Sequence, residues 1–574
     1  MYVYKNSFTG DNFQKYKEHY AIKKYIDYIN ECCDQFRGTP IEALTFSKFS
    51  MFDKIGDRRV YEQDYFIHRR RASGFMLRAW LYHEEDDIKE LEDILWAICD
   101  EYSWALPAHL PNITTDESVV AEQVDLFASE TAHMLAETLS MCGDCIHPAV
   151  KRRCIDEIFK RVLEPFETKD TQKHRLGWEF SGGNWSAVCG GAVGMTAIYV
   201  IEDEERLKKI IERVRVSCNR FIDTCEADGV CGEGISYWTY AMRLYVSFDE
   251  LMKERFGESI VSDKEKFRRV AEFPSIVCME NRICVNFSDM PSYKMVLPFG
   301  ILAKLNECYD VPIPEESYYF NSMGGSFPCE AIRNIEWLKP ELLHNSSRKD
   351  DVFLPIGQWL VKHNENMSMV IKGGYNDEPH NHNDIGSYMF IKDGCVIADD
   401  LGAQKYTKAY FDENRYNHLN TRSKGHSVPV VNGCEQLYGR EYAADKFEQT
   451  EKGVKISFAG AYDSDACLKS LIREASLDEN GMTVKDSFIF GKNQNSITER
   501  ILTKLDARVT DKKTVALLKD GDTVGTLGLL SEGKIKLLND SYLMQGVDAV
   551  QNVTVIELEI ATEADSIEIA YCIK

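Results

Sequence analysis

From about residue 60 to residue 310, apolar residues recur every three or four positions, which is the spacing of amphipathic helices. In the segment 84–102, this spacing places Ile88, Leu91, Leu95 and Ile98 on one face. The pattern recurs in the segments 119–141, 148–166, 205–225 and 236–256. Because no β-prone segment separates them, we expect helical hairpins packed in series, as in an all-α toroid or solenoid.

One predicted helix differs from the others in its side-chain size. The segment 184–200, NWSAVCGGAVGMTAIYV, is rich in glycine and alanine. Small side chains allow two helix backbones to approach closely. We therefore expect this helix to lie very close to its neighbours.

After Pro312 the pattern changes from helical to extended. The segment 316–350 is turn-rich and predicts a linker or covering loop. From Val352 onward, short β-prone runs alternate with turn residues: QWLVKH, MSMVIKGG, SYMFIKDGCVIADD, VKISFAGAY, GMTVKDSFIFG, VTVIELEIAT and SIEIAYCI. This texture predicts an antiparallel β-sandwich. The expected architecture is a helical (α/α) toroid over 1–315, a linker over 316–350 and the sandwich over 351–574.

Composition narrows the class of protein. The 574 residues include 68 Lys and Arg against 92 Asp and Glu, a net charge of −24. Such an acidic chain is a poor candidate for general nucleic-acid binding. No apolar run is long enough to cross a membrane, and the first residues lack a signal-peptide pattern. Eighteen cysteines are then expected as reduced thiols in the cytoplasm. A chain whose export signal had been removed would look the same, and would then be secreted or periplasmic.

The most informative stretch is His380-Asn381-His382-Asn383-Asp384, followed later by Asp399-Asp400 and His426. If the stretch is extended, His380 and His382 point to the same side. Two imidazoles and a carboxylate can form a three-ligand zinc site with one open position. The alternative is a set of polar loop residues, but two closely spaced histidines in an otherwise apolar region favour a functional role.

Two stretches in the helical part also carry candidate chemistry. Asn184 and Trp185 follow two glycines at the start of the small-residue helix. Asn184 is either a helix cap or a neutral donor that binds a substrate carboxylate beside a stacking tryptophan, and spacing alone leaves both open. The stretch 233–240, EGISYWTY, is either core or a sugar platform with a tyrosine acid or base.

Other features carry less weight. Cys142 and Cys145 form a CxxC without a βαβ context or a second pair, so neither a redox nor a zinc role is favoured. The short basic run 68–71 is either a solvated face or an anion-binding patch. His418 has no evident partner. Nucleotide-binding and hydrolase-elbow motifs are absent from the sequence.

Together these stretches resemble the heparinase II/III family of polysaccharide lyases. The similar segments are SWALPAHL (103–110), DLFASETAHMLAE (125–137), GGNWSAVCGG (182–191), DGVCGEGISYWTY (228–240), GGYNDEPHNHNDIGSYMFIKDG (373–394), ADDLGAQKYT (398–407) and RSKGHSVPVVNG (422–433). They cover about residues 60–435 in order, whereas the last part of the chain is similar only in its β texture.

The resemblance implies a toroid followed by a sandwich, an active site in the cleft between them and β-elimination of uronate-containing glycans. Asn184 would bind the uronate carboxylate, while Tyr237 and His380 would act as base and acid. Expected substrate contacts are Trp104, His109, Trp185, Glu233, Tyr240 and Arg70. The implied metal ligands are His382, Asp400 and His426, holding a structural zinc ion, although manganese would also suit the site. Asp399 beside Asp400, and Tyr240 one turn from Tyr237, leave two of these assignments open.

The expected function is therefore cleavage of an anionic polysaccharide or oligosaccharide, such as heparan, chondroitin or hyaluronan, with alginate-like oligouronates as a further option. No nucleic-acid or membrane partner is expected, and a homo-oligomer is left open. One alternative is a glycoside hydrolase, for which Glu233 and Asp384 are the candidate carboxylates although they are expected in different domains. A second is a non-catalytic glycan-binding protein, which would have no need of a base.

Overall fold

The computed structural model describes residues 2–110, 120, 123–168, 176–291, 295–320, 327–547 and 549–574. The chain divides into two compact units. The first contains residues 1–224, 237–271 and 296–345, and the second contains residues 225–236, 272–295 and 346–574. Two segments from the range predicted as toroid, 225–236 and 272–295, thus group with the β-rich unit.

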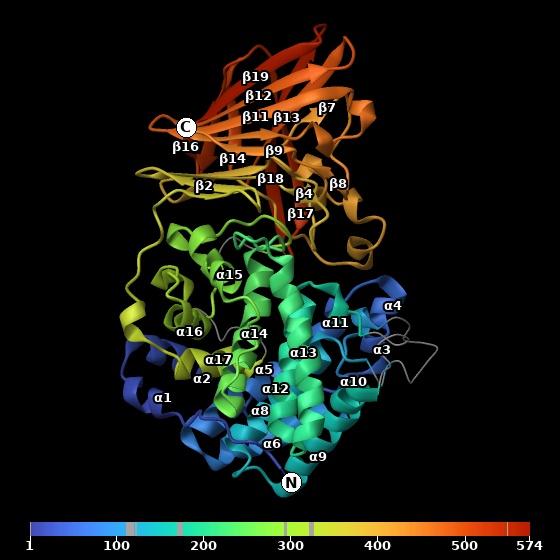
Figure 1. The fold of residues 1–574 in the computed structure, drawn as a ribbon, viewed down its shortest axis with the longest axis vertical. Helices are drawn as coiled ribbons and strands as arrows, with labels where there is room; N and C mark the ends of the chain where they lie inside the picture. The colour runs from blue at the N-terminus through green and yellow to red at the C-terminus, as the bar shows by residue number, and fades with distance from the viewer. Residues whose placement is uncertain are drawn as a thin grey trace. The chain divides into compact units, whose positions relative to one another are not determined.

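The first unit is built of helices (Figure 1). In order they are α1 Asp11–Tyr16, α2 Tyr20–Phe36, α3 Phe46–Phe49, α4 Met51–Ile55, α5 Arg59–Tyr82, α6 Glu85–Asp100, α8 Leu126–Cys142, α9 Pro148–Ile158, α10 Glu164–Thr168, α11 Trp178–Ser181, α12 Asn184–Val200, α13 Glu204–Thr224, α14 Ile235–Phe256, α15 Lys264–Val277, α16 Phe299–Tyr309 and α17 Pro328–Glu336.

The helices predicted from apolar spacing are confirmed. The segments 84–102, 205–225 and 236–256 form α6, α13 and α14. The segment 148–166 forms α9 and α10, joined by a π-helical turn over Phe159–Leu163. The described part of 119–141 contains most of α8, whose N-terminal cap is Asp125. The helices α1 to α4 were not predicted, and the expected linker 316–350 contains α17.

The small-residue helix α12 packs as closely as its composition predicts. A Cβ atom added to Gly191 would lie 2.8 Å from the carbonyl oxygen of Leu244 in α14. A Cβ added to Gly194 would lie 2.6 Å from the ring of Phe248. Glycine is therefore required at these positions by the approach of a neighbouring helix.

The second unit is built of antiparallel strands. They are β1 Val352–Leu354, β2 Trp359–His363, β3 Met367–Lys372, β4 Tyr375–Asn376, β5 Tyr388–Lys392, β6 Cys395–Ala398, β7 Val430–Val431, β8 Gly439–Ala443, β9 Lys446–Gln449, β10 Gly453–Ser457, β11 Leu468–Asp478, β12 Gly481–Phe490, β13 Asn495–Thr503, β14 Asp506–Asp511, β15 Thr514–Lys519, β16 Asp522–Leu529, β17 Lys534–Leu543, β18 Val550–Thr562 and β19 Ser566–Ile573.

These strands form three main sheets around one apolar core. Their orders are β1-β2-β3-β5-β6, β14-β15-β16-β19-β12-β11-β10-β9 and β17-β18-β13-β7, and β4 pairs with β8 alone. Buried side chains alternate with half-exposed ones along β11 and β12, as expected of strands with one buried face. The core contains residues of all three sheets, such as Phe390, Leu471 and Ile556. The predicted fold class, a helical toroid followed by antiparallel β-sheets, is confirmed.

None of the helices that the structure describes is long and apolar enough to cross a membrane. All eighteen cysteines lie in described segments, and none of them forms a disulfide bond there.

Candidate active site and metal centre

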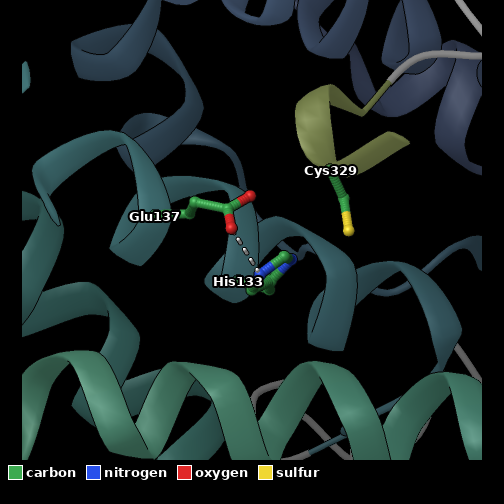
Figure 2. Close-up of side chains that lie close together, drawn as sticks. All are labelled: His133, Glu137 and Cys329. Carbon is green, nitrogen blue, oxygen red and sulfur yellow. Dashed lines mark ion pairs between the residues drawn. The ribbon is translucent and has the colours of Figure 1, made fainter. Parts of the chain in front are cut away.

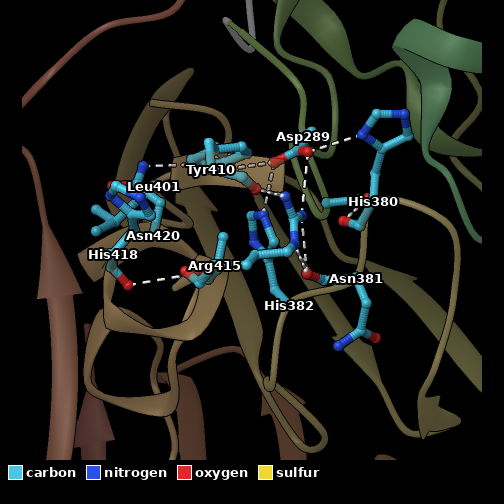
Figure 3. A network of polar contacts seen from close by, with 12 residues as sticks. Asp289, His380, Asn381, His382, Leu401, Tyr410, Arg415, His418 and Asn420 are labelled. Carbon is cyan, nitrogen blue, oxygen red and sulfur yellow. Dashed lines mark hydrogen bonds and ion pairs between the residues drawn. The ribbon is translucent and has the colours of Figure 1, made fainter. Parts of the chain in front are cut away.

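The predicted His380 to Asp384 stretch lies in the loop between β4 and β5 of the second unit. It is not an extended strand, because His380 has a φ of 59° and the residues around it form turns. The conditional expectation of a strand is therefore wrong. The two histidines are nevertheless brought together, because both contact one carboxylate, that of Asp289 (Figure 3).

Asp289 is buried and accepts hydrogen bonds on both carboxylate oxygens. His380 Nδ1 lies 2.8 Å from Oδ2, and His382 Nε2 lies 3.0 Å from Oδ1. The Tyr410 hydroxyl donates to Oδ1, and Arg415 Nη2 lies 3.1 Å from Oδ2. Burial alone would raise the pKa of Asp289, but these hydrogen bonds and the Arg415 charge hold it well below the ordinary range. Asp289 is thus a fixed anion.

This anion decides how His380 is protonated and oriented. A carboxylate accepts but does not donate, so His380 Nδ1 carries the proton that it shares with Asp289. In the neutral ring, Nε2 is then the basic nitrogen. The His380 side chain is 18% exposed, whereas Asp289 is fully buried. A histidine held in one tautomer by a buried aspartate has the arrangement of a general base.

His382, Asp400 and His426 form a second group beside this pair. One potential ligand atom from each of the three buried residues lies within 4.8 Å of the others. Asp400 follows β6, and His426 follows a run of short 3₁₀ turns after that strand. His426 Nδ1 lies 2.9 Å from Asp400 Oδ2, and its Nε2 lies 2.9 Å from the Asn420 carbonyl oxygen. The three predicted ligands are therefore close enough to bind one ion.

In His382 and His426, the Nε2 nitrogen makes a hydrogen bond, which leaves Nδ1 as the nitrogen that could bind a metal ion. His382 donates through Nε2 to Asp289, so its Nδ1 has a lone pair, and this buried nitrogen has no hydrogen-bond partner among the described residues. His426 donates through Nε2 to a carbonyl, which turns the Nδ1 lone pair toward an Asp400 oxygen. A metal ion bound between these atoms would accept the lone pairs of both rings and balance the Asp400 carboxylate. Metal-binding histidines usually donate their other N–H to a carboxylate or carbonyl in this way.

The structure also decides between the two adjacent aspartates. Asp399 pairs with Lys504, with Oδ2 3.1 Å from Nζ. Asp400 contacts His426 and receives a further hydrogen bond on Oδ1 from the Gly402 amide. Asp400, and not Asp399, therefore joins the two histidines. Nitrogen and carboxylate donors of this kind suit zinc or manganese.

In the first unit, the start of α12 carries a second set of predicted residues. Gly183 is the N-terminal cap, so Asn184 occupies the first helical position and is buried. Trp185 is half-buried and packs edge-on against His109, with 4.8 Å between ring centroids. His109 Nδ1 lies 2.6 Å from Asp125 Oδ2, and Arg58 donates to its Nε2 at 3.1 Å. Two of the predicted substrate contacts, Trp185 and His109, are thus adjacent.

Tyr237 and Tyr240 lie one turn apart at the start of α14 but differ in their surroundings. The Tyr240 hydroxyl donates to Glu130 Oε2 at 2.6 Å, and Arg243 pairs with the other oxygen of Glu130. Burial and the Glu130 carboxylate raise the pKa of Tyr240 well above its ordinary value. Tyr240 is therefore a poor base. Tyr237 is half-exposed, as Tyr240 is, and its role as base or acid stays a prediction.

Three further residues predicted to contact substrate, Trp104, Glu233 and Arg70, differ in their burial. Trp104 is 1% exposed and donates its indole N–H to the Ile98 carbonyl, which makes it a core residue. Glu233 is 3% exposed and belongs to the second unit. Arg70 is exposed on α5, with Tyr28 and Cys32 of α2 as its electrostatic neighbours. Trp104 and Glu233 are thus buried and Arg70 is exposed, and a substrate contact at any of the three stays a prediction.

The remaining sequence features have structural explanations. Of the basic run 68–71, His68 and Arg69 pair with the buried Glu101 and Arg71 pairs with Glu90, which leaves Arg70 as its exposed member. His418 Nδ1 hydrogen-bonds to Gln404. Cys145 donates to the carbonyl of Cys142 rather than pairing with its thiol.

Sequence reasoning missed three residues of the second-unit site: Asp289, Tyr410 and Arg415. Asp289 lies about ninety positions before the histidines, in a segment with no motif around it. Tyr410 and Arg415 come from 3₁₀ turns after β6. The only available signal was that a catalytic histidine needs an acidic partner, and that rule names no position.

Comparisons with known proteins agree with this description. No family model matches the sequence, and no curated protein matches it significantly. Solved structures do match. A heparinase III has a TM-score of 0.62 at 11% identity, covering 100% of this chain and 92% of its own. Heparan sulfate lyase HepC from Pedobacter heparinus has a TM-score of 0.57 at 13% identity, covering 98% and 92%. A chondroitin AC lyase from Streptomyces coelicolor A3, in complex with chondroitin sulphate, has a TM-score of 0.54 at 10% identity, covering 97% and 79%.

At these identities the likeness establishes the architecture. The chain has the fold of heparinase III and of related glycosaminoglycan lyases along almost its whole length.

Proposed function

We propose that this protein is a polysaccharide lyase that cleaves uronic-acid-containing glycans by β-elimination. The observation that carries the proposal is the His380–Asp289 pair, which provides a partly exposed imidazole in a fixed tautomer. The shared fold with glycosaminoglycan lyases supports the same conclusion.

The chemistry explains which groups are needed. Elimination removes the proton from C5 of the uronate, forms the C4–C5 double bond and breaks the bond from C4 to the glycosidic oxygen. The electron pair of the C5–H bond becomes the double bond, and the departing O4 gains a proton. The C5 proton is weakly acidic because its loss places two negative charges on one enolate. Donors that neutralise the carboxylate lower this barrier, by about 3–4 kcal/mol for each well-placed donor.

Asn184 suits the role of carboxylate donor. Its side chain is neutral, so it can donate without requiring a nearby counter-ion. It occupies the first position of the 17-residue helix α12. An anion at this end also interacts favourably with the helix dipole. Trp185, supported by His109, supplies an aromatic face on which a sugar ring can stack.

His380 and Tyr237 share the two proton transfers in the proposal. Asp289 accepts from His380 Nδ1, which makes Nε2 the nitrogen that exchanges a proton with substrate. Tyr237 is assigned the second proton transfer because the hydroxyl of its neighbour Tyr240 is bound to Glu130. The assignment of base and acid between His380 and Tyr237 depends on which face of the uronate carries the C5 proton.

His382, Asp400 and His426 would hold a zinc ion with a structural function. When bound, the ion would join the β4–β5 loop to the segments after β6 and balance the charge of Asp400. Because His382 and His380 donate to the same carboxylate, this bracing also restrains His380. These three ligands suit zinc and manganese alike, so metal analysis of the purified protein decides between the two ions.

The proposed substrates are glycosaminoglycans such as heparan sulfate, chondroitin sulfate or hyaluronan, and oligosaccharides derived from them. The test is ultraviolet absorbance of the unsaturated uronate, measured with purified protein on a panel of these glycans and on alginate. We expect absorbance to rise with one class. New reducing ends without absorbance would show hydrolysis instead, and no change with any glycan would contradict the proposal for this panel.

The hydrolase alternative has less support in the described residues. Its candidate carboxylates, Glu233 and Asp384, both belong to the second unit, which corrects the prediction that they lie in different domains. Both are buried, and Asp384 pairs with Lys372 at 2.7 Å. A glycosidase needs both carboxylates to reach the scissile bond.

A further inference from the structure

A second group of metal-binding side chains lies inside the helical unit. His133 and Glu137 are one turn apart on α8, and Cys329 is near the start of α17 (Figure 2). All three are at most 2% exposed, and one potential ligand atom of each lies within 4.8 Å of the others. The three belong to one compact unit and take no part in the proposed elimination.

Two atoms of this group lack the hydrogen bonds that burial normally requires. His133 Nε2 and Glu137 Oε2 are both buried without a hydrogen-bond partner among the described residues. The distance from His133 Nε2 to Glu137 Oε1 is 3.6 Å, which is too long for a hydrogen bond. Buried polar atoms are rarely left unsatisfied, so their absence of partners points to a missing ligand.

The partners on the outer side of the group hold the ligands in place. Glu137 Oε1 accepts from the Tyr199 hydroxyl at 3.1 Å and from Arg333 Nη2 at 2.8 Å. Arg333 Nη1 also donates to the Cys329 carbonyl at 3.0 Å. One carboxylate oxygen is therefore occupied while the other remains available, as in metal sites whose ligands are oriented by outer hydrogen bonds.

We propose that His133, Glu137 and Cys329 bind a zinc ion. Imidazole nitrogen, carboxylate oxygen and thiolate sulfur are the three ligand types that zinc accepts, and a tetrahedral ion would keep one further position. Binding replaces the thiol proton, which is released to solvent, and the thiolate and carboxylate then balance the two charges of the ion. Arg333 remains as one positive charge, next to the Glu137 oxygen that it already contacts.

A cavity lies beside three residues that contact the ligands, although none of the ligands lines it. It has a volume of about 350 Å³ and is lined in part by Tyr199, Ser247 and Arg333, all of which are neighbours of the ligands. Water in this cavity can reach Arg333 and screen its charge. The ion itself would join α8 to α17, two helices that are far apart in the sequence. Its effect is to fix the last helix of the unit against α8.

The test uses the optical spectrum of the full-length protein loaded with Co²⁺. A thiolate ligand gives cobalt an intense charge-transfer band in the near ultraviolet. The His382, Asp400 and His426 group contains no sulfur, so it cannot produce this band. We expect this band in the cobalt-loaded wild-type protein. In the zinc-loaded protein, the fine structure above the zinc X-ray absorption edge should show a sulfur neighbour at about 2.3 Å. A wild-type protein that shows neither the cobalt band nor the sulfur neighbour of zinc would overturn the proposal, and this result requires no variant.

Variants assign the signal to the residues. Cys329→Ser is expected to lose the band and one equivalent of bound zinc per chain, with unchanged circular dichroism. The matched control is Cys218→Ser, which alters a buried cysteine of α13 outside the group and should retain both. His426→Ala should keep the thiolate band. If Cys329→Ser retains the band, or Cys218→Ser loses it, the assignment is wrong.

Discussion

The two regions that carry the proposed chemistry are built in different ways. At the start of α12 and α14, the candidate residues follow one another within a few positions, and each is placed by the helix that contains it. In the second unit, by contrast, the candidate residues come from separate segments. Asp289 meets His380 and His382, and His382 lies near Asp400 and His426, only in the folded chain.

This difference determines what each region can do. A helix start offers a fixed backbone and a dipole, which suit the binding of a carboxylate. Loops that meet around one buried anion can fix the tautomer of a histidine, which suits proton transfer. The same loops need something to hold them together, and the proposed metal ion would do so. The predictions below test this division, beginning with the largest expected effect.

Loss of the proposed base should have the largest effect. His380→Ala is expected to lower kcat about 10²–10⁴-fold, because general acid–base catalysis contributes a factor of this size. Steady-state kinetics on the best substrate of the panel measures it. His363→Ala alters a half-buried histidine of β2 and is the control. A His380→Ala enzyme within threefold of the control would remove His380 from the mechanism.

Substitutions of the two tyrosines of α14 should differ clearly in their effects on activity and stability. Tyr237→Phe is expected to lower kcat by about 10²-fold or more, since it removes a proton-transfer group. Tyr240→Phe should keep most activity but lower the free energy of unfolding by about 1 kcal/mol, because Glu130 loses a donor. Kinetics and urea denaturation on the same preparations test this. The reverse pattern would transfer the catalytic role to Tyr240.

Loss of the Asp289 charge should affect both zinc binding and catalysis, because Asp289 contacts both His382 and His380. Asp289→Asn is expected to reduce zinc affinity about 10–100-fold, because outer partners of metal ligands have effects of this size, and to lower kcat as well. Equilibrium dialysis and kinetics measure the two. Asp87→Asn changes a buried aspartate of the first unit that pairs with Arg37 and Arg78, and it should leave both unchanged. Normal zinc affinity in Asp289→Asn would show that the proposed coupling is absent.

The last expected effect is a shift in thermal stability and not in the rate of catalysis. In a Cys329→Ser background, only the His382, Asp400 and His426 group should respond to added zinc. Zinc at about 100 times its Kd is expected to stabilise this protein by about 2.7 kcal/mol. That raises the midpoint of thermal unfolding by a few degrees, as scanning calorimetry would show. Adding His426→Ala should abolish the response, and an undiminished response would contradict the ligand assignment.

Sequence patterns predicted the elements well because burial repeats at a fixed spacing. The spacing of Ile88, Leu91 and Leu95 identified α6, and the small residues of α12 predicted its close packing. The candidate metal ligands His382, Asp400 and His426 were named by the resemblance to the heparinase II/III family, and the structure brings one potential ligand atom of each within 4.8 Å of the others. The stretch 380–384 contributes to this group from a loop and not from the extended strand on which the expectation was conditioned.

What the sequence did not reveal depends on long-range contacts. Asp289 has no local pattern, because its role comes from histidines that follow it at a distance in the chain. Trp104 was expected to contact substrate, but its indole is buried against α6 and bonded to Ile98. An aromatic residue in a core and one in a sugar site have the same local sequence signal.

The most direct test of the central claim counts products. In one reaction, the number of new C4–C5 double bonds is measured by ultraviolet absorbance and the number of new reducing ends by a chemical assay. Elimination predicts one double bond for each reducing end formed by wild-type protein, and both products formed about 10²–10⁴-fold more slowly by His380→Ala. Reducing ends without double bonds would contradict the account and identify the protein as a hydrolase.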